Sequence, residues 1–106
     1  MDNIKVIIKE PGKYPVEKTI NNSLDSLQEI VGGPIETVTP TSDLCIICNE
    51  DGKLKNLPYN ITMFGIDFVG TLILVGVDGD EFADVPITLG RVIESPISER
   101  IDKNNA

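Results

Sequence analysis

The sequence predicts an α+β domain with a mainly antiparallel sheet of five or six strands. One amphipathic helix is expected on one face of that sheet, and short helical segments at the C-terminus. Three observations support this class. Short β-branched runs recur between turn signals, one well-capped segment has helical spacing, and 106 residues with 41% hydrophobic side chains suit one packed core. We expect a single domain over residues 1–106, with its core at about 4–101 and a frayed tail at 102–106.

The N-terminal residues predict a β-hairpin. Ile4, Val6 and Ile8 recur with period two, the pattern of a strand with one face on the core. A turn signal follows at residues 11–13, and a second alternating run covers residues 16–20. The second run is more polar, so we expect it to pair with the first strand and to lie at a sheet edge.

A helix is expected from Ser23 to Val31. The apolar residues that share its helical spacing are Leu24, Leu27, Ile30 and Val31. Asn21, Asn22 and Ser23 offer N-caps before this run, and Asp25 complements the helix dipole in the first turn. Gly32-Gly33 supplies a left-handed C-cap, and Pro34 prevents continuation.

Further strands are expected in the middle of the chain. The run 35–39 alternates and is expected to end at Pro40, whereas 44–49 is apolar on both faces and should be central. The Asp-Gly pair within 50–53 is typical of a tight hairpin turn.

The last third predicts one long strand and then helical pieces. Residues 68–75 form a β-branched run, in which Gly70 indicates a bulge or a close backbone approach. Helical spacing returns at 89–93, and Ser95-Pro96 is typical of the start of a short helix that carries Ile97 and Ile101.

Charge and composition exclude several function classes. The net charge is −8, from 17 acidic and 9 scattered basic residues, so direct nucleic-acid binding is not expected. The N-terminus has no secretory pattern, and the longest apolar-rich run, 64–77, is too short and interrupted to span a membrane. We therefore expect a cytoplasmic protein in the host cytosol, with no membrane partner and no cofactor.

The C-x-x-C pair of Cys45 and Cys48 lies within an expected strand. Residues i and i+3 of a strand point to opposite faces, so these thiols should not join each other or share a metal. With no histidine and no third cysteine in the chain, we interpret both as buried structural residues; a redox site and a metal site are the alternatives.

No catalytic constellation is visible. Histidine, the commonest general base, is absent, and no spacing singles out a carboxylate pair. Asp78, Asp80, Glu81 and Asp84 do not match a calcium loop, so we expect a solvated acidic loop there and no metal site.

One stretch combines cations, amides and an aromatic ring, features that suit an anionic ligand or a nucleotide base. The candidate ligand-binding residues are Lys53, Lys55, Asn56, Tyr59, Asn60, Lys13 and Tyr14. The alternative is an ordinary surface connection with Leu54 and Leu57 turned inward.

Four motifs together carry a family resemblance. They are E-P-G-K at 10–13, L-x-x-L-Q-E-I-V-G-G-x-I-E at 24–36, I-C-N-E-D-G-K at 47–53 with L-P-Y-N at 57–60, and G-x-x-x-x-G-T at 65–71. Over residues 4–76 the chain resembles a family of small domains of unknown function, common in phages and mobile elements of Gram-positive bacteria. The resemblance implies such an origin, a structural Cys48 and an incidental Cys45, and no activity or catalytic residues.

We therefore expect a non-enzymatic, phage-type binding protein. In one version it sequesters a small anionic or nucleotide ligand to counter host defence, with the pocket at a symmetric homo-oligomer interface. In the alternative it is an acidic protein-interaction module, in the extreme a DNA mimic, that inhibits a host protein. An enzyme that uses carboxylates is a third possibility.

Overall fold

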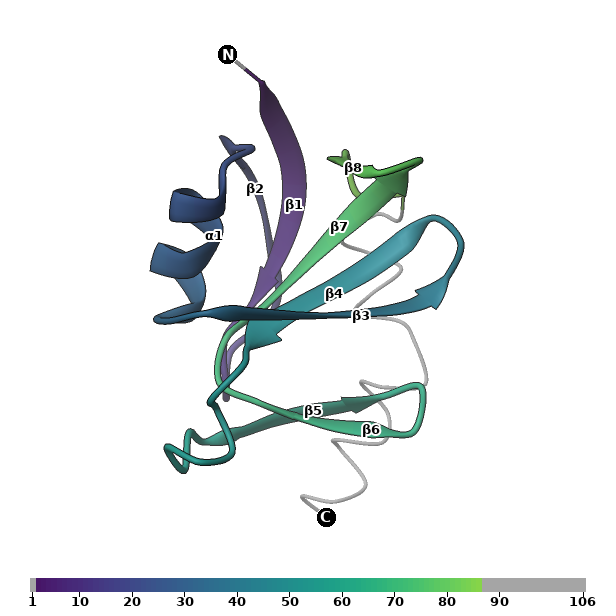
Figure 1. The fold of residues 1–106 in the computed structure, drawn as a ribbon. Helices are drawn as coiled ribbons and strands as arrows, with labels where there is room; N and C mark the ends of the chain where they lie inside the picture. The colour runs from purple at the N-terminus through teal and green to yellow at the C-terminus, as the bar shows by residue number, and fades with distance from the viewer. Residues whose placement is uncertain (1, 87–106) are drawn as a thin grey trace.

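The structure is a computed structural model that describes residues 2–86. Eight strands and one helix lie within these residues, as Figure 1 shows. In chain order they are β1 (Asn3–Lys9), β2 (Val16–Asn21), α1 (Leu24–Val31), β3 (Ile35–Thr41), β4 (Leu44–Asn49), β5 (Tyr59–Met63), β6 (Ile66–Val69), β7 (Leu72–Asp78) and β8 (Glu81–Ala83).

The expected α+β class is confirmed. Six strands form one antiparallel sheet in the order β2-β1-β7-β4-β3, with β8 paired to β7, and β5 and β6 form a separate two-stranded sheet. As expected, β1 and β2 form a hairpin, with Ile4 opposite Ile20, and β2 lies at a sheet edge. β4 is central and buried along its whole length.

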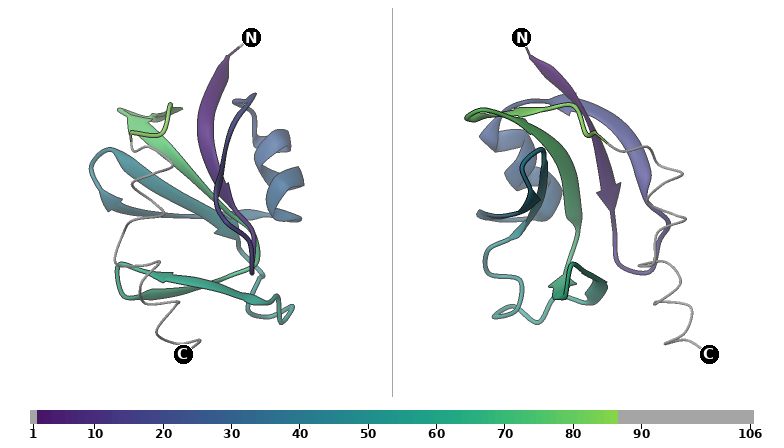
Figure 2. Two further views of the ribbon diagram at one scale, coloured as in Figure 1. Left: turned by 180° about the vertical axis from the view of Figure 1, so that it is seen from behind. Right: turned by 90° about the vertical axis from the view of Figure 1, so that its right-hand side faces the viewer.

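The main sheet has an apolar core on each face. On one face the helix residues Leu27 and Val31 pack with alternate residues of β1, β4 and β7. On the other face Ile61, Met63 and Phe68 of the β5–β6 hairpin cover the remaining alternate residues of the same three strands. Figure 2 shows that the sheet is strongly curved, with α1 beside it and the β5–β6 hairpin at its lower end.

The helix has the predicted caps. The Ser23 hydroxyl accepts from the Ser26 backbone N–H at 3.2 Å, and Gly32 adopts a left-handed φ of 82°. The Gly32 and Gly33 N–H groups both donate to the Gln28 carbonyl. Both ends of the helix are therefore closed by residues whose roles are visible in the sequence.

Pro40 does not end its strand, which corrects one expectation. β3 continues to Thr41, with a register shift between Val38 and Thr41 against β4. β3 lies at the sheet edge, where a residue without an N–H costs no ladder hydrogen bond on its open side.

The Asp-Gly signal at 50–53 does not produce a hairpin, which is a second correction. Both edges of β4 are occupied, by β3 and by β7, so the chain after Asn49 cannot return along β4. It turns through residues 50–56 instead and enters β5, which pairs with β6. This β5–β6 hairpin was not predicted.

The run 68–75 is not one strand, which is a third correction. It divides at Gly70, with a φ of +73°, into β6 and β7, which belong to different sheets. A Cβ on Gly70 would lie 2.8 Å from Leu57 Cδ1, so the expected close approach is present. The division therefore falls at a glycine with a left-handed backbone, against which Leu57 packs.

The acidic segment at 78–84 is not a loop throughout, a fourth correction. Asp78 pairs with Glu81 across the turn Gly79-Asp80, and Glu81–Ala83 forms β8. The helical pieces expected at 89–93 and 95–101 lie outside the described residues. The helix α1, which is the one helix within residues 2–86, lacks the length and apolarity needed to cross a membrane.

Candidate functional site

The loop between β4 and β5 is held from within. Asn49 is buried, donates to the Val31 carbonyl at 3.1 Å and accepts from the Asp51 N–H at 2.8 Å, so it joins the end of α1 to the loop. Backbone bonds from Lys55 to Asp51 and from Leu57 to Gly52 then close the turn. The loop is a pre-organised element rather than a loose connection.

The tip of this loop points outward. Lys53 and Lys55 are exposed, and Leu54 between them is 86% exposed, so the expectation that Leu54 turns inward is wrong. Leu57 does turn inward, against Gly52 and Gly70. Asn56 has a φ of 55°, a left-handed value that asparagine tolerates better than most residues. We call Lys53, Leu54 and Lys55 the basic tip.

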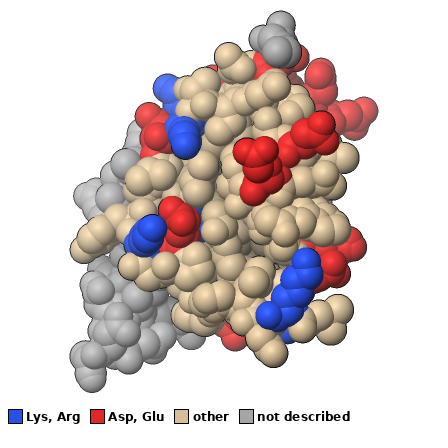
Figure 3. Space-filling view, turned by 90° about the vertical axis from the view of Figure 1, so that its left-hand side faces the viewer, with Lys and Arg blue, Asp and Glu red and all other residues tan. Residues whose placement is uncertain are grey.

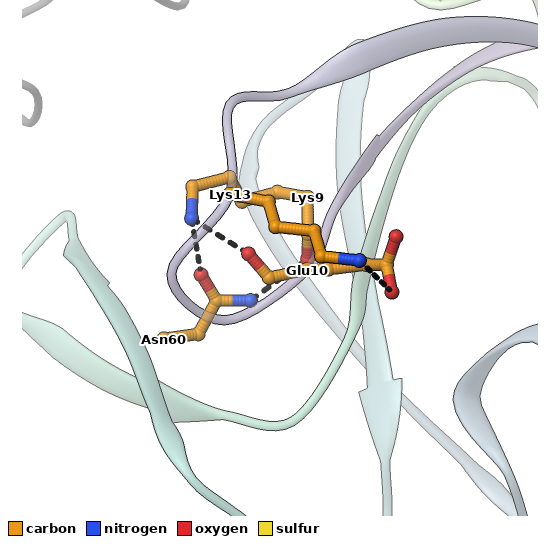
Figure 4. Close-up of polar contacts among 4 residues, drawn as sticks. All are labelled: Lys9, Glu10, Lys13 and Asn60. Carbon is orange, nitrogen blue, oxygen red and sulfur yellow. Dashed lines mark hydrogen bonds and ion pairs between the residues drawn. The ribbon is translucent and has the colours of Figure 1, made fainter.

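Asn60 lies in the interior, away from the basic tip. It is only 5% exposed, and its Nδ2 donates to the Lys9 carbonyl at 2.8 Å and to the Gly70 carbonyl at 2.7 Å. Its Oδ1 accepts from Lys9 Nζ at 3.0 Å, an interaction that Figure 4 shows beside the turn after β1. With these bonds made, Asn60 has a structural role in the interior, and the structure does not bring it together with the basic tip.

Lys9 is the buried cation of this network. Its side chain is 7% exposed, and Nζ also donates to the Glu10 carbonyl at 2.9 Å. Burial lowers the pKa of this amine from its ordinary value of 10.5. We call Lys9, Asn60 and the Gly70 carbonyl the Lys9–Asn60 network; it ties β1 to β5 and to the connection between β6 and β7.

The other candidate residues are on the surface. Lys13 Nζ lies 3.8 Å from Glu10 in an exposed ion pair, and Tyr14 is 81% exposed. Tyr59 donates its hydroxyl to Thr62 at 2.6 Å, since Thr62 donates to Asp67 at 2.6 Å. On the molecular face that Figure 3 shows, the lysine side chains of the described residues lie in separate small groups rather than in one basic patch.

The two cysteines lie on opposite faces of β4, as predicted. Cys45 packs in the core under the helix and Cys48 in the core under the β5–β6 hairpin, and both are free. Burial raises the pKa of each thiol, and Glu36 raises that of Cys48 further. A thiol with a raised pKa has little thiolate at neutral pH and reacts slowly.

We therefore expect both thiols to resist labelling in the native protein at pH 7 and to react fully in denaturant. A mild oxidant should produce no intramolecular disulfide. The measurement is a thiol-reagent time course with intact mass. Native labelling at the denatured rate, or an internal disulfide, would contradict the strand geometry.

A second site was missed by sequence reasoning. A depression of about 490 Å³ lies between β1, the β2–α1 connection and the β7–β8 hairpin. It is lined by Asp2, Asn3, Ile4, Asn22, Asp78, Glu81, Phe82, Ala83 and Asp84. The acidic residues within 78–84 were the part of this site that the sequence could indicate. The contributions of residues 2–4 and 22 depend on the tertiary fold. We call this surface the acidic depression.

The walls of the acidic depression are tied together. The Lys5 N–H donates to Asp84 Oδ1 at 2.8 Å, and the Val85 N–H donates to the Lys5 carbonyl. Asn22 Nδ2 lies 3.4 Å from the Phe82 carbonyl. In the described part of the chain, no lysine or arginine lines it. Within residues 2–86, no group of three or more histidine, cysteine or acidic side chains is placed to hold a metal ion.

The fold and these two surfaces define a small α+β domain built on one antiparallel sheet, with a basic tip and an acidic depression. The chain belongs to the family described as a domain of unknown function (DUF3846), which it matches over residues 4–95. That match extends beyond the span of 4–76 over which the motifs resembled such a family. No curated protein and no solved structure matches the chain.

Proposed function

We propose that this protein is a non-enzymatic interaction module whose acidic depression receives basic side chains of a partner protein. The observation that carries the proposal is the depression itself, whose lining within residues 2–86 includes four carboxylates together with Ile4 and Phe82, and no lysine or arginine. Arginine and lysine side chains combine a charged head with an apolar stem, so they match such a lining.

The arrangement of the carboxylates favours a macromolecule over a metal ion. They are spread round a volume of about 490 Å³, and the described residues contain no metal cluster. Asp78 and Glu81 are direct cross-strand partners, and like charges in that position repel each other. A basic partner would relieve this repulsion, and the net charge of −8 would speed its approach.

The family resemblance supports an origin in a phage or mobile element, and hence a host protein in the bacterial cytosol as the partner. A host protein that normally binds DNA would present such basic side chains. DNA mimicry is then the extreme form of the same function, and duplex DNA would compete for the partner.

The test uses an octa-arginine peptide and calorimetry at low and physiological salt. We expect the Asp78→Lys, Glu81→Lys variant to bind at least about tenfold more weakly, a loss of roughly 1.4 kcal/mol. The variant exchanges one like-charge pair for another, so hairpin repulsion stays similar. The matched control is Glu29→Lys, Glu50→Lys, which changes the net charge equally at exposed positions outside the depression. An equal loss in the control would mean that only net charge matters, and would refute the site.

Capture of a small anionic ligand is the second candidate function. It is favoured by the anchored loop that presents Lys53 and Lys55, with Asn56 and Tyr59 following and Lys13 and Tyr14 as further surface residues. Native mass spectrometry with cyclic and ADP-ribose-type nucleotides tests it. A bound mass that is absent in Lys53→Ala, Lys55→Ala would support this function, whereas equal binding by that variant would eliminate the site.

A further inference from the structure

The basic tip and the acidic depression lie at opposite ends of the molecule. In Figure 1 the β7–β8 hairpin is at the top, and the loop between β4 and β5 is at the bottom; both views in Figure 2 agree. The two surfaces therefore cannot meet within one copy. They can meet between two copies placed head to tail.

The two surfaces have complementary chemistry. The tip presents Leu54, 86% exposed, between two exposed lysines on a loop held by its own backbone bonds. The depression is lined mainly by polar atoms, with carboxylates at its edge and a smaller apolar area from Phe82 and Ala83 beside the buried Ile4. A leucine placed in the depression would cover this small apolar area, and its flanking lysines would lie near Asp78, Glu81 or Asp84, so charge complementarity is the main attraction.

We propose that the basic tip of one copy docks in the acidic depression of a second copy. Such a contact is heterologous, because two different patches meet, so it continues into rings or open chains instead of stopping at a two-fold dimer. One loop in one depression buries less than a standard interface, so the assembly is weak and depends on concentration. Its exposed ion pairs are screened, and therefore weakened, by added salt.

This inference goes beyond the proposed function but shares its depression. A second copy and a basic partner protein would occupy the same carboxylates, so they exclude each other. Self-association would thus hold the depression covered until a partner with higher affinity displaces the tip.

Two charge-reversal variants test the inference by sedimentation velocity over a wide range of protein concentrations at low salt. We expect the natural sequence to associate. The double variant Lys53→Glu, Lys55→Glu should remain monomeric when it is measured alone, and so should the double variant Asp78→Lys, Glu81→Lys. A mixture of the two variants should associate again, because each supplies the surface that the other has lost. A mixture that stays monomeric, or a natural chain that never associates, would overturn the inference.

Leu54 provides the second readout. Leu54→Ser should weaken association at least about tenfold. The control, Leu24→Ser, alters a leucine on α1 that is also exposed and should leave association unchanged. If Leu54→Ser and Leu24→Ser weakened association equally, the docking geometry would be overturned. Peptide binding separates the two proposals, because the Lys53→Glu, Lys55→Glu variant retains the acidic depression. If this variant no longer bound octa-arginine, the proposed function would be refuted. The self-association result would be unaffected by that outcome.

Discussion

Replacement of Asn60 by leucine is expected to lower the free energy of unfolding by about 3 kcal/mol or more. The change removes three hydrogen bonds and leaves the Lys9 amine and the Gly70 carbonyl buried without this partner. Each buried polar group left unsatisfied costs about 1–3 kcal/mol, and a charged one costs more. Such a loss is a large part of a typical stability of about 5–15 kcal/mol. Urea unfolding measures it.

The control for this prediction is Asn21→Leu, which changes an exposed asparagine at the end of β2 and should cost far less. A double-mutant cycle with Lys9→Met gives the coupling. When both partners are apolar, no amine remains unpaired, so the double variant should be less destabilised than the sum of the single changes. Additive effects would show that the Lys9–Asn60 network is not a unit.

Lys9 should also give stability a defined pH dependence. Because burial lowers its pKa below 10.5, the unfolded chain keeps this proton to a higher pH than the native protein does. The charged amine therefore costs stability at neutral pH, and that cost falls as pH rises from the lowered pKa to 10.5. The stability of the natural chain relative to Lys9→Met should rise over this window. A difference that is flat or falls would contradict the burial of the amine.

Replacement of Gly70 by alanine is expected to cost about 2–4 kcal/mol. Alanine at a φ of +73° carries backbone strain of about 1 kcal/mol or more, and the added Cβ would lie 2.8 Å from Leu57 Cδ1. The strain and the crowding act at the point where the chain passes from β6 to β7. Thermal or urea unfolding gives the loss.

Gly65 supplies the matched control, since it has a φ of +76° with nothing within 4 Å of a built Cβ. Gly65→Ala should thus cost only the backbone strain, about 1 kcal/mol. The difference between the two glycines isolates the contact with Leu57. In a Leu57→Ala background the Gly70→Ala change should become less costly, and equal losses at both glycines would refute the crowding argument.

The motifs that carried the family resemblance have structural roles in this fold. Asn49 joins α1 to the loop, Asn60 forms the Lys9–Asn60 network, and Gly70 accommodates Leu57. These structural roles explain why the four motifs indicated a family without indicating an activity. The candidate functional surfaces instead involve exposed residues such as Leu54 and Glu81, whose local patterns are those of ordinary loops and turns.

Local physics was enough to predict much of the fold. The caps of α1, the hairpin of β1 and β2, the two buried faces of β4 and the opposite faces of Cys45 and Cys48 follow from patterns within a few residues. Cap hydrogen bonds and the alternation of side chains along a strand are set by neighbours in the chain, so the sequence alone carries them.

Strand pairing and the placement of charged surfaces depend on contacts between residues that are far apart in the chain. The chain after Asn49 could not form a hairpin with β4 because β3 and β7 occupy both of its edges, and the run 68–75 divides at Gly70, where the distant Leu57 packs against the glycine. The acidic depression combines residues 2–4, 22 and 78–84, which no local pattern connects. Local sequence patterns were therefore enough to indicate most elements and their buried faces. The pairing partners of those elements become defined only when the whole core packs together, because they depend on contacts between distant residues.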